Sequence, residues 1–111
     1  HESKAYKICS IVAKTLLTLD IEITPKTLAV TLNNEDKLFE LRDQIKILEQ
    51  DSVVESVYSD LITRYIKDGR FDLEQFKLDL EGIAGILYRI SFSYVGEIFD
   101  QEQNISLLES N

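Results

Sequence analysis

The chain has very few of the residues that build catalytic and metal sites. Its 111 residues include one cysteine, one histidine and one proline, and they contain neither tryptophan nor methionine. The single cysteine, Cys9, excludes an internal disulfide and a zinc site built from several thiolates. The single histidine, His1, stands at the N-terminal end, where no histidine-based triad or metal cluster is expected. We therefore expect this chain to have no catalytic site, no cofactor and no metal.

Positive charge and long apolar runs are also scarce. The chain has 12 Lys and Arg residues against 20 Asp and Glu residues, a formal net charge of -8. A nucleic-acid backbone or an anionic membrane would be repelled by this charge at long range. No apolar run approaches the roughly 20 residues that a membrane span needs. We expect a cytoplasmic protein, which the single cysteine fits, with neither nucleic acid nor membrane as its partner.

Helix signals, in contrast, recur through the chain. Apolar residues fall at three- and four-residue steps, and strand patterns do not recur. Thr24 and Pro25 begin one helix as N-cap and first helical residue, and Asn34 begins the next. Capping boxes open at Ser52 and at Asp72, and Gly69 is expected to end the helix between them as a left-handed C-cap. The sequence predicts an all-α fold: a compact bundle of about five helices, with no sheet and with a long C-terminal helix reaching about residue 100.

The chain is expected to form one helical domain over residues 1–111. Its ordered part should cover about residues 4–100, and a looser acidic and polar tail should follow over about 101–111. Because the chain begins with His1 rather than methionine, we expect it to be a piece of a longer protein. Cys9, Leu38, Leu48 and Val54 lie on apolar helix faces, and the predicted core further includes Ile8, Val12, Leu16, Leu28, Leu41, Ile45, Val57, Leu61, Phe76, Ile83 and Leu87.

Three stretches carry a resemblance to a known family: "TPKTLAVTL", then "KLFELRDQI", then "SDLITRYI". Their order is similar to that in the helical N-terminal domain that precedes the GGDEF domain of many bacterial diguanylate cyclases. That family has a TP-[RK]-x-[YF]-A-[LV]-W-Y stretch, a pELrxxID helix and a dELYERYI-like segment. Leu28, Thr31 and Leu32 depart from it, because the family usually has aromatic residues there. The matching residues are Thr24, Pro25, Lys26, Ala29, Val30, Glu40, Leu41, Ile45, Asp60, Leu61, Arg64, Tyr65 and Ile66.

The resemblance covers about residues 5–95 and implies a regulatory role. The chain contains no GGDEF or GGEEF motif and no RxxD inhibitory-site motif. It would therefore be a non-catalytic signalling input and dimerisation module that controls a C-terminal GGDEF domain in the same chain. In the family, cyclic di-GMP forms when two facing domains each present one GTP. The alternative is a stand-alone acidic helical protein that binds a partner, such as an immunity protein, an antitoxin or a phage-encoded inhibitor.

The predicted C-terminal helix has apolar residues on two opposite faces, whereas a surface helix needs only one. One interpretation is a central helix surrounded by the other four. The other is a symmetric homodimer, in which the glycine-bearing face admits a second copy at close range. The residues of this expected dimer interface are Leu78, Gly82, Gly85, Arg89, Phe92, Gly96 and Phe99.

Three tyrosines suggest a ligand site. Tyr58, Tyr65 and Tyr88 could place hydroxyls at a cleft between the fourth and fifth helices, where a small molecule of unknown identity would bind. Tyrosines at helical spacing also commonly pack their rings at the edge of a core and leave the hydroxyl in water. Both interpretations stand at this point.

Overall fold

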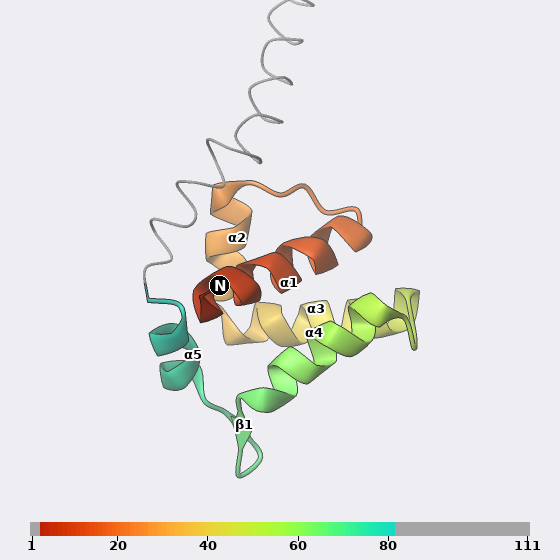
Figure 1. Cartoon of the computed structure of the whole chain (residues 1–111). Coiled ribbons are helices and arrows are strands. Elements are labelled where there is room, and N and C mark those ends of the chain that lie inside the picture. Colours follow the sequence, from red (N-terminus) through yellow and green to blue (C-terminus); the bar gives the residue numbers. More distant parts are fainter. Residues whose placement is uncertain (1–2, 82–111) are drawn as a thin grey trace, which may run out of the picture.

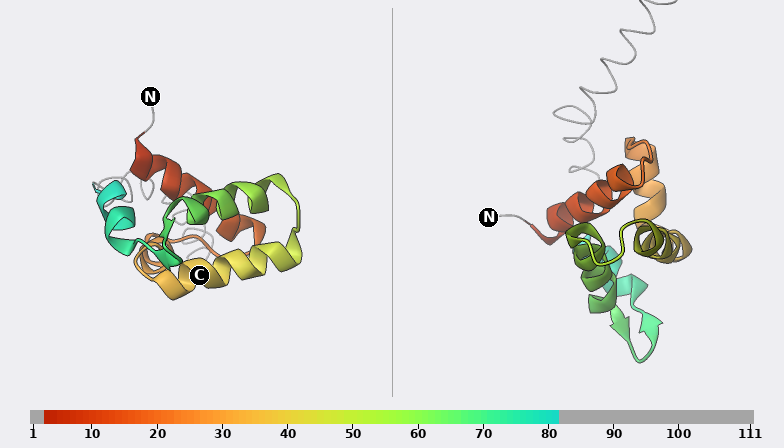
Figure 2. Two further views of the ribbon diagram at one scale, coloured as in Figure 1. Left: turned by 90° about the horizontal axis from the view of Figure 1, so that it is seen from below. Right: turned by 90° about the vertical axis from the view of Figure 1, so that its right-hand side faces the viewer.

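The computed structural model describes residues 3–81, and these residues form a mostly helical domain (Figure 1). Figure 2 shows α1, α2, α3 and α4 around one core, with α5 beside the N-terminal end of α1. The prediction of a helical bundle is confirmed for this part of the chain. The elements are α1 (Lys4–Thr18), α2 (Pro25–Leu32), α3 (Glu35–Leu48), α4 (Val53–Arg64), β1 (Ile66–Lys67), β2 (Arg70–Phe71) and α5 (Leu73–Asp79).

A side-chain cap begins each of the five described helices. In every case an oxygen of the N-cap residue accepts a hydrogen bond from a backbone N–H that has no partner inside the helix. Pro25 is the first residue of α2, as predicted. The caps at Thr24, Asn34, Ser52 and Asp72 are confirmed, and the N-caps in chain order are Ser3, Thr24, Asn34, Ser52 and Asp72, with N···O distances of 3.0–3.1 Å.

The two predicted capping boxes are only half formed. Glu55 Oε1 accepts from the backbone N–H of Asp51 at 3.3 Å, one residue before the N-cap. Its other oxygen accepts from the Ser59 hydroxyl at 2.6 Å, and this bond lowers the pKa of Glu55. In α5 the side chain of Gln75 turns forward along the helix and donates to Asp79 at 2.9 Å. Both glutamate and glutamine therefore bind groups other than the N-cap backbone.

Most of the predicted core is buried. Eight predicted residues are at most 3% exposed: Ile8, Val12, Leu16, Leu28, Leu41, Ile45, Leu61 and Phe76. Cys9 is also in the core, and burial raises the pKa of its thiol to about 11. Ile83 and Leu87 lie outside the described residues. The prediction is wrong for Val57, which is 41% exposed, and for Leu48, which is 57% exposed.

Tyr58 takes the place that was predicted for Val57. One residue along a helix is a rotation of about 100 degrees, so only one of these neighbours can face the core. The larger Tyr58 ring is fully buried, and its hydroxyl donates to the backbone carbonyl of Leu38 at 2.7 Å. Leu48 is exposed because it is the last residue of α3, beyond the buried Ile45.

The prediction of no sheet is wrong at one place. Antiparallel β1 and β2 pair Ile66 with Phe71 and Lys67 with Arg70. Asp68 and Gly69 form the turn between them, with φ angles of 52° and 76°, as a type I′ hairpin turn requires. Gly69 therefore adopts the expected left-handed conformation in a hairpin rather than at a helix end. Helix α4 ends earlier, with its C-cap at Tyr65.

The hairpin brings α5 back against the bundle through an aromatic cluster. Phe71 of β2 lies 5.6 Å from the ring of Phe39 in α3 and 5.4 Å from that of Phe76 in α5. Tyr65 meets Phe76 edge to face at 5.0 Å. Such edge contacts are favourable beyond the area they bury. Helix α5 ends at Asp79, and residues 80–81 do not continue it, which argues against the predicted uninterrupted C-terminal helix. The remaining residues of that predicted helix lie outside the described residues.

None of the described helices has the length and apolar character needed to cross a bilayer.

Candidate functional site

The structure separates the tyrosines that were predicted to share a cleft. Tyr58 is buried and its hydroxyl is bound to Leu38 of α3. Tyr65, at the end of α4, lines a cleft formed with α1 and α5. Tyr88 lies outside the described residues. A cleft is therefore present beside α4 and α5, and Tyr65 is the predicted residue that the described part of the chain places there.

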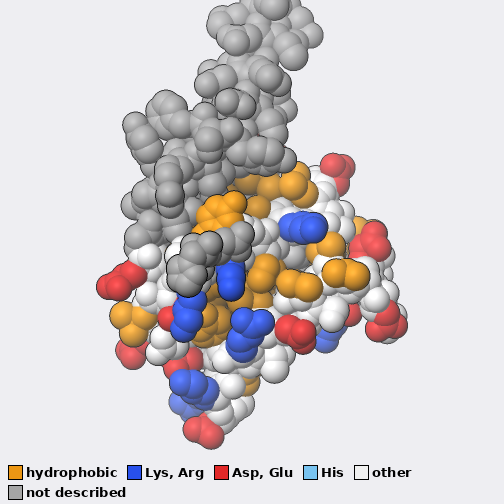
Figure 3. All heavy atoms as spheres, viewed as in Figure 1, with side chains coloured by type: hydrophobic (Ala, Val, Ile, Leu, Met, Phe, Trp, Pro, Cys, Tyr) orange, Lys and Arg blue, Asp and Glu red, His pale blue; other side chains and the backbone are white. Residues whose placement is uncertain are grey.

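This cleft is unusually basic for an acidic chain, and we refer to it as the basic cleft. Its volume is about 450 Å³. Figure 3 shows Lys and Arg side chains gathered on the face that holds α5, the hairpin and the start of α1. Among the described residues that line it, one carboxylate, Asp79, accompanies four cationic side chains. The lining residues are Lys4, Lys7, Ile8 and Ile11 from α1, Leu61, Arg64 and Tyr65 from α4 and its cap, Lys67 from β1, and Gln75 and Asp79 from α5.

Asp79 is held by three neighbours. The Tyr65 hydroxyl donates to Oδ2 at 2.6 Å, and the Gln75 amide donates to Oδ1 at 2.9 Å. The Lys4 ammonium lies 4.0 Å from Oδ1. The bond from Tyr65 lowers the pKa of Asp79, and the Gln75 bond and the Lys4 charge act in the same direction. Burial raises the pKa of Tyr65 to about 12, with a further contribution from Asp79. At neutral pH the pair is a carboxylate and a neutral phenol.

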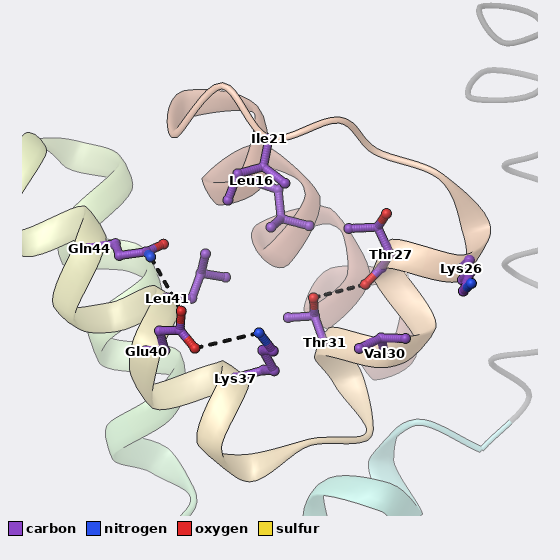
Figure 4. A pocket seen from close by; sticks show the side chains of 10 residues that line it. All are labelled: Leu16, Ile21, Lys26, Thr27, Val30, Thr31, Lys37, Glu40, Leu41 and Gln44. Carbon is purple, nitrogen blue, oxygen red and sulfur yellow. Dashed lines mark hydrogen bonds and ion pairs between the residues drawn. The ribbon is translucent and has the colours of Figure 1, made fainter.

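A second hollow, the α2–α3 pocket, has a volume of about 330 Å³ (Figure 4). Figure 4 shows Thr27 and Thr31 of α2 on one side and Glu40 and Gln44 of α3 on the other. The Thr31 hydroxyl donates to the carbonyl of Thr27 at 2.8 Å, and Lys37 pairs with Glu40 at 3.6 Å. The pocket thus has a polar rim over an apolar floor, and it is lined by Leu16, Ile21, Lys26, Thr27, Val30, Thr31, Lys37, Glu40, Leu41 and Gln44.

Two of the stretches that carry the family resemblance supply all of the residues that line the α2–α3 pocket except Leu16 and Ile21. Lys26, Thr27, Val30 and Thr31 come from "TPKTLAVTL", and Lys37, Glu40, Leu41 and Gln44 come from "KLFELRDQI". The third stretch, "SDLITRYI", contributes Leu61, Arg64 and Tyr65 to the basic cleft. The departures Leu28, Thr31 and Leu32 are all buried. Leu28 and Leu32 therefore pack in the core in this chain, and Thr31 lines the pocket.

Of the predicted dimer interface, the structure describes Leu78 alone. Leu78 lies on α5 and is 58% exposed, so it is available at the surface of residues 3–81. Gly82, Gly85, Arg89, Phe92, Gly96 and Phe99 lie outside the described residues.

A different apolar surface surrounds the turn between α3 and α4, and no sequence pattern had indicated it. We call it the turn patch; Ile47 and Val53 are 86% and 78% exposed there. Glu49 and Asp51, which are also exposed, lie in the turn itself. The four residues of the turn patch are Ile47, Leu48, Val53 and Val57.

Known proteins give no further assignment, since comparison of the chain with family models, with curated proteins and with solved structures returns no match. Within residues 3–81, no three His, Cys, Asp or Glu side chains are grouped so that they could hold a metal ion.

Proposed function

We propose that this chain is a non-catalytic signalling input and dimerisation module that regulates a C-terminal GGDEF diguanylate cyclase domain in the same protein. One observation carries the proposal. Two of the stretches that resemble the N-terminal domains of such cyclases, on α2 and α3, pack together and supply most of the residues that line the α2–α3 pocket. The stretches that carry the resemblance thus form neighbouring helices beside one pocket, and this arrangement supports the proposal.

The proposed mechanism is control of geometry. Cyclic di-GMP synthesis needs two facing catalytic domains, each with one GTP, so a module that pairs two chains sets their separation. We place the pairing on the face that begins at Leu78, which is exposed on α5. The part of the chain that follows α5 would carry this geometry to the cyclase domain. The module would act in the cytoplasm, which its buried, unpaired Cys9 suits.

The reading frame beyond Asn111 gives a direct test. The proposal requires a GGDEF-type domain downstream in the same gene. A stop codon directly after Asn111 would contradict it.

Self-association gives a second test on the chain itself. Light scattering at tens of micromolar should give twice the monomer mass of 12.8 kDa. Leu78→Glu and Phe92→Glu should return the chain to monomer, because each places a charge in the proposed apolar interface. Leu17→Glu is a matched control: Leu17 is 56% exposed, close to the 58% of Leu78, but it lies on α1. A monomeric wild-type chain, or equal effects of Leu17→Glu and Leu78→Glu, would contradict the dimer.

The turn patch favours a second candidate function, a stand-alone acidic protein that binds a partner. Exposed apolar side chains bordered by polar residues commonly mark protein interaction sites. Ile47 and Val53 form such a surface beside the acidic Glu49 and Asp51. This candidate requires a reading frame that stops after Asn111 and a chain that remains monomeric, the two outcomes that the regulatory module excludes.

A further inference from the structure

The basic cleft is formed where similarly patterned faces of two helices meet. On α1, Lys4 and Lys7 precede Ile8 and Ile11 at the three- and four-residue spacing of one helix face. On α4, Leu61 lies beneath Arg64 and Tyr65 with the same spacing. Ile8 and Leu61 are at most 3% exposed, so they close the bottom of the cleft. The cleft therefore combines an apolar floor with a cationic rim.

Within the described part of the chain, the rim carries more positive charge than neighbouring carboxylates neutralise. Within residues 3–81, neither Lys7 nor Arg64 has a carboxylate within ion-pair distance. Lys67 is 3.5 Å from Asp72. Asp79 already receives bonds from Tyr65 and Gln75 on its two oxygens. Two of the four rim cations, Lys7 and Arg64, therefore have no carboxylate partner among the described residues and are available to an anion.

We propose that the basic cleft binds a small organic phosphate: a phosphoryl group held by Lys7 and Arg64, attached to an apolar or aromatic body that lies over Ile8, Ile11 and Leu61. The guanidinium of Arg64 presents paired N–H donors that match two phosphate oxygens, and Lys7 adds a compact positive charge. The volume of about 450 Å³ lies within the range of small-molecule sites. The site does not depend on the proposed regulatory role, although it would give such a module a signal to respond to.

The overall negative charge of the chain favours a small anion over a large one. A formal charge of -8 repels an extended polyanion, whose charges reach beyond the cleft. Charges on exposed groups are screened beyond about 8 Å at physiological ionic strength. A small phosphate ester inside the cleft is therefore governed by the nearby cations Lys4, Lys7, Arg64 and Lys67. This difference favours a small ligand over nucleic acid or a membrane surface.

Phenyl phosphate is a suitable probe because it has one phosphoryl group and one apolar ring. Titrated into the ¹⁵N-labelled chain, it should produce saturable amide shifts at Lys7, Ile11, Arg64 and Tyr65. Inorganic phosphate should bind the same residues more weakly, because it lacks the ring, and phenol should not saturate them. Ile11→Ala should weaken the binding of phenyl phosphate and leave the binding of inorganic phosphate unchanged.

Charge variants test the phosphoryl contact. Lys7→Gln and Arg64→Gln should each weaken phenyl phosphate binding about tenfold, and Arg64→Lys should have a smaller effect. Lys14→Gln is the matched control, since Lys14 is exposed on the same helix and does not line the cleft. It should leave the dissociation constant unchanged. Circular dichroism of each variant at the temperature of the titration confirms that it is folded, and Arg64→Lys retains the charge if a neutral substitution unfolds the chain.

Three results would overturn the proposal. The first is the absence of saturable shifts up to about 10 mM phenyl phosphate, which is weaker than a site with two charge-assisted bonds allows. The second is equal weakening by Lys14→Gln and Lys7→Gln, which would indicate unspecific attraction to surface charge. The third is tighter binding of a short poly-glutamate peptide at the same residues, which would assign the cleft to an acidic protein segment.

Discussion

The hydroxyl of Tyr65 donates a 2.6 Å hydrogen bond to the carboxylate of Asp79, and this bond joins the end of α4 to the end of α5. The side chain of Asp79 is only 12% exposed. The ring of Tyr65 packs edge to face against Phe76 at 5.0 Å. Tyr65 therefore holds α5 in two ways, through its ring and through its hydroxyl, and both contacts lie beside the basic cleft.

Removing the hydroxyl should separate these two contributions. We expect Tyr65→Phe to lower the free energy of unfolding by about 1.5 to 2 kcal/mol, because a hydrogen bond to an ionised group is lost while the ring remains. Urea unfolding followed by circular dichroism measures this difference. Tyr6→Phe is the control, since Tyr6 is 42% exposed, and it should change stability by less than about 0.5 kcal/mol.

A double-mutant cycle assigns the loss to the bond itself. Tyr65→Phe and Asp79→Ala should show a combined effect well below the sum of their separate effects, because each removes the hydrogen bond between the two side chains. Additive effects would mean that the hydroxyl contributes nothing through Asp79.

The same pair predicts a pH dependence. Because the Tyr65 bond holds the pKa of Asp79 below its ordinary value, its stabilisation is present above about pH 4 and is lost as the pH falls further. Burial raises the pKa of Tyr65 to about 12, above the value of about 10 in an unfolded chain. The stabilisation that the folded state gains from the neutral Tyr65 hydroxyl is therefore present below about pH 10 and is lost as the pH rises toward 12.

Urea unfolding of wild type and Tyr65→Phe at acidic, neutral and alkaline pH tests this profile. The difference in unfolding free energy should be constant between about pH 5 and pH 9 and should shrink on both sides. A difference that stays constant from acid to alkali would show that titration of Tyr65 and Asp79 is not linked to folding.

The start of α2 gives a local test of capping. The hydroxyl of Thr24 accepts from the backbone N–H of Thr27 at 3.0 Å, whereas Pro25 at the first helical position gives up no intrahelical bond. We expect Thr24→Ala to cost about 1 kcal/mol and Pro25→Ala to cost well under that amount. Thermal and urea unfolding should give the same ranking. The reverse ranking would mean that the Thr24 cap does not stabilise α2.

The helix starts were predictable because capping chemistry is local. Thr24, Asn34, Ser52 and Asp72 each bond to a backbone N–H three residues later, and the sequence alone contains that relationship. Gly69 was harder, because a left-handed glycine suits both a helix C-cap and a hairpin turn. Only the pairing of β1 with β2 decides between them. The Asp-Gly pair at 68–69 is common in two-residue hairpin turns, but the sequence prediction did not use it.

Contacts between distant segments were not predictable from spacing. Tyr58 is buried rather than Val57 because its hydroxyl reaches the carbonyl of Leu38, twenty residues earlier in the chain. The basic cleft joins Lys7 on α1 to Arg64 on α4, and each looks like an ordinary solvated charge within its own helix. Periodicity assigns a residue to a face of its helix, but it does not say which other element of the fold packs against that face.

Cyclic di-GMP synthesis tests the regulatory proposal most directly. The chain 1–111 should be joined to an isolated GGDEF domain that is inactive as a monomer, and the product from GTP should be measured by chromatography. We predict synthesis by the fusion, little by the isolated domain, and loss of synthesis in Leu78→Glu but not in Leu17→Glu. A fusion that is no more active than the isolated domain, or one that is equally active with Leu78→Glu, would contradict it.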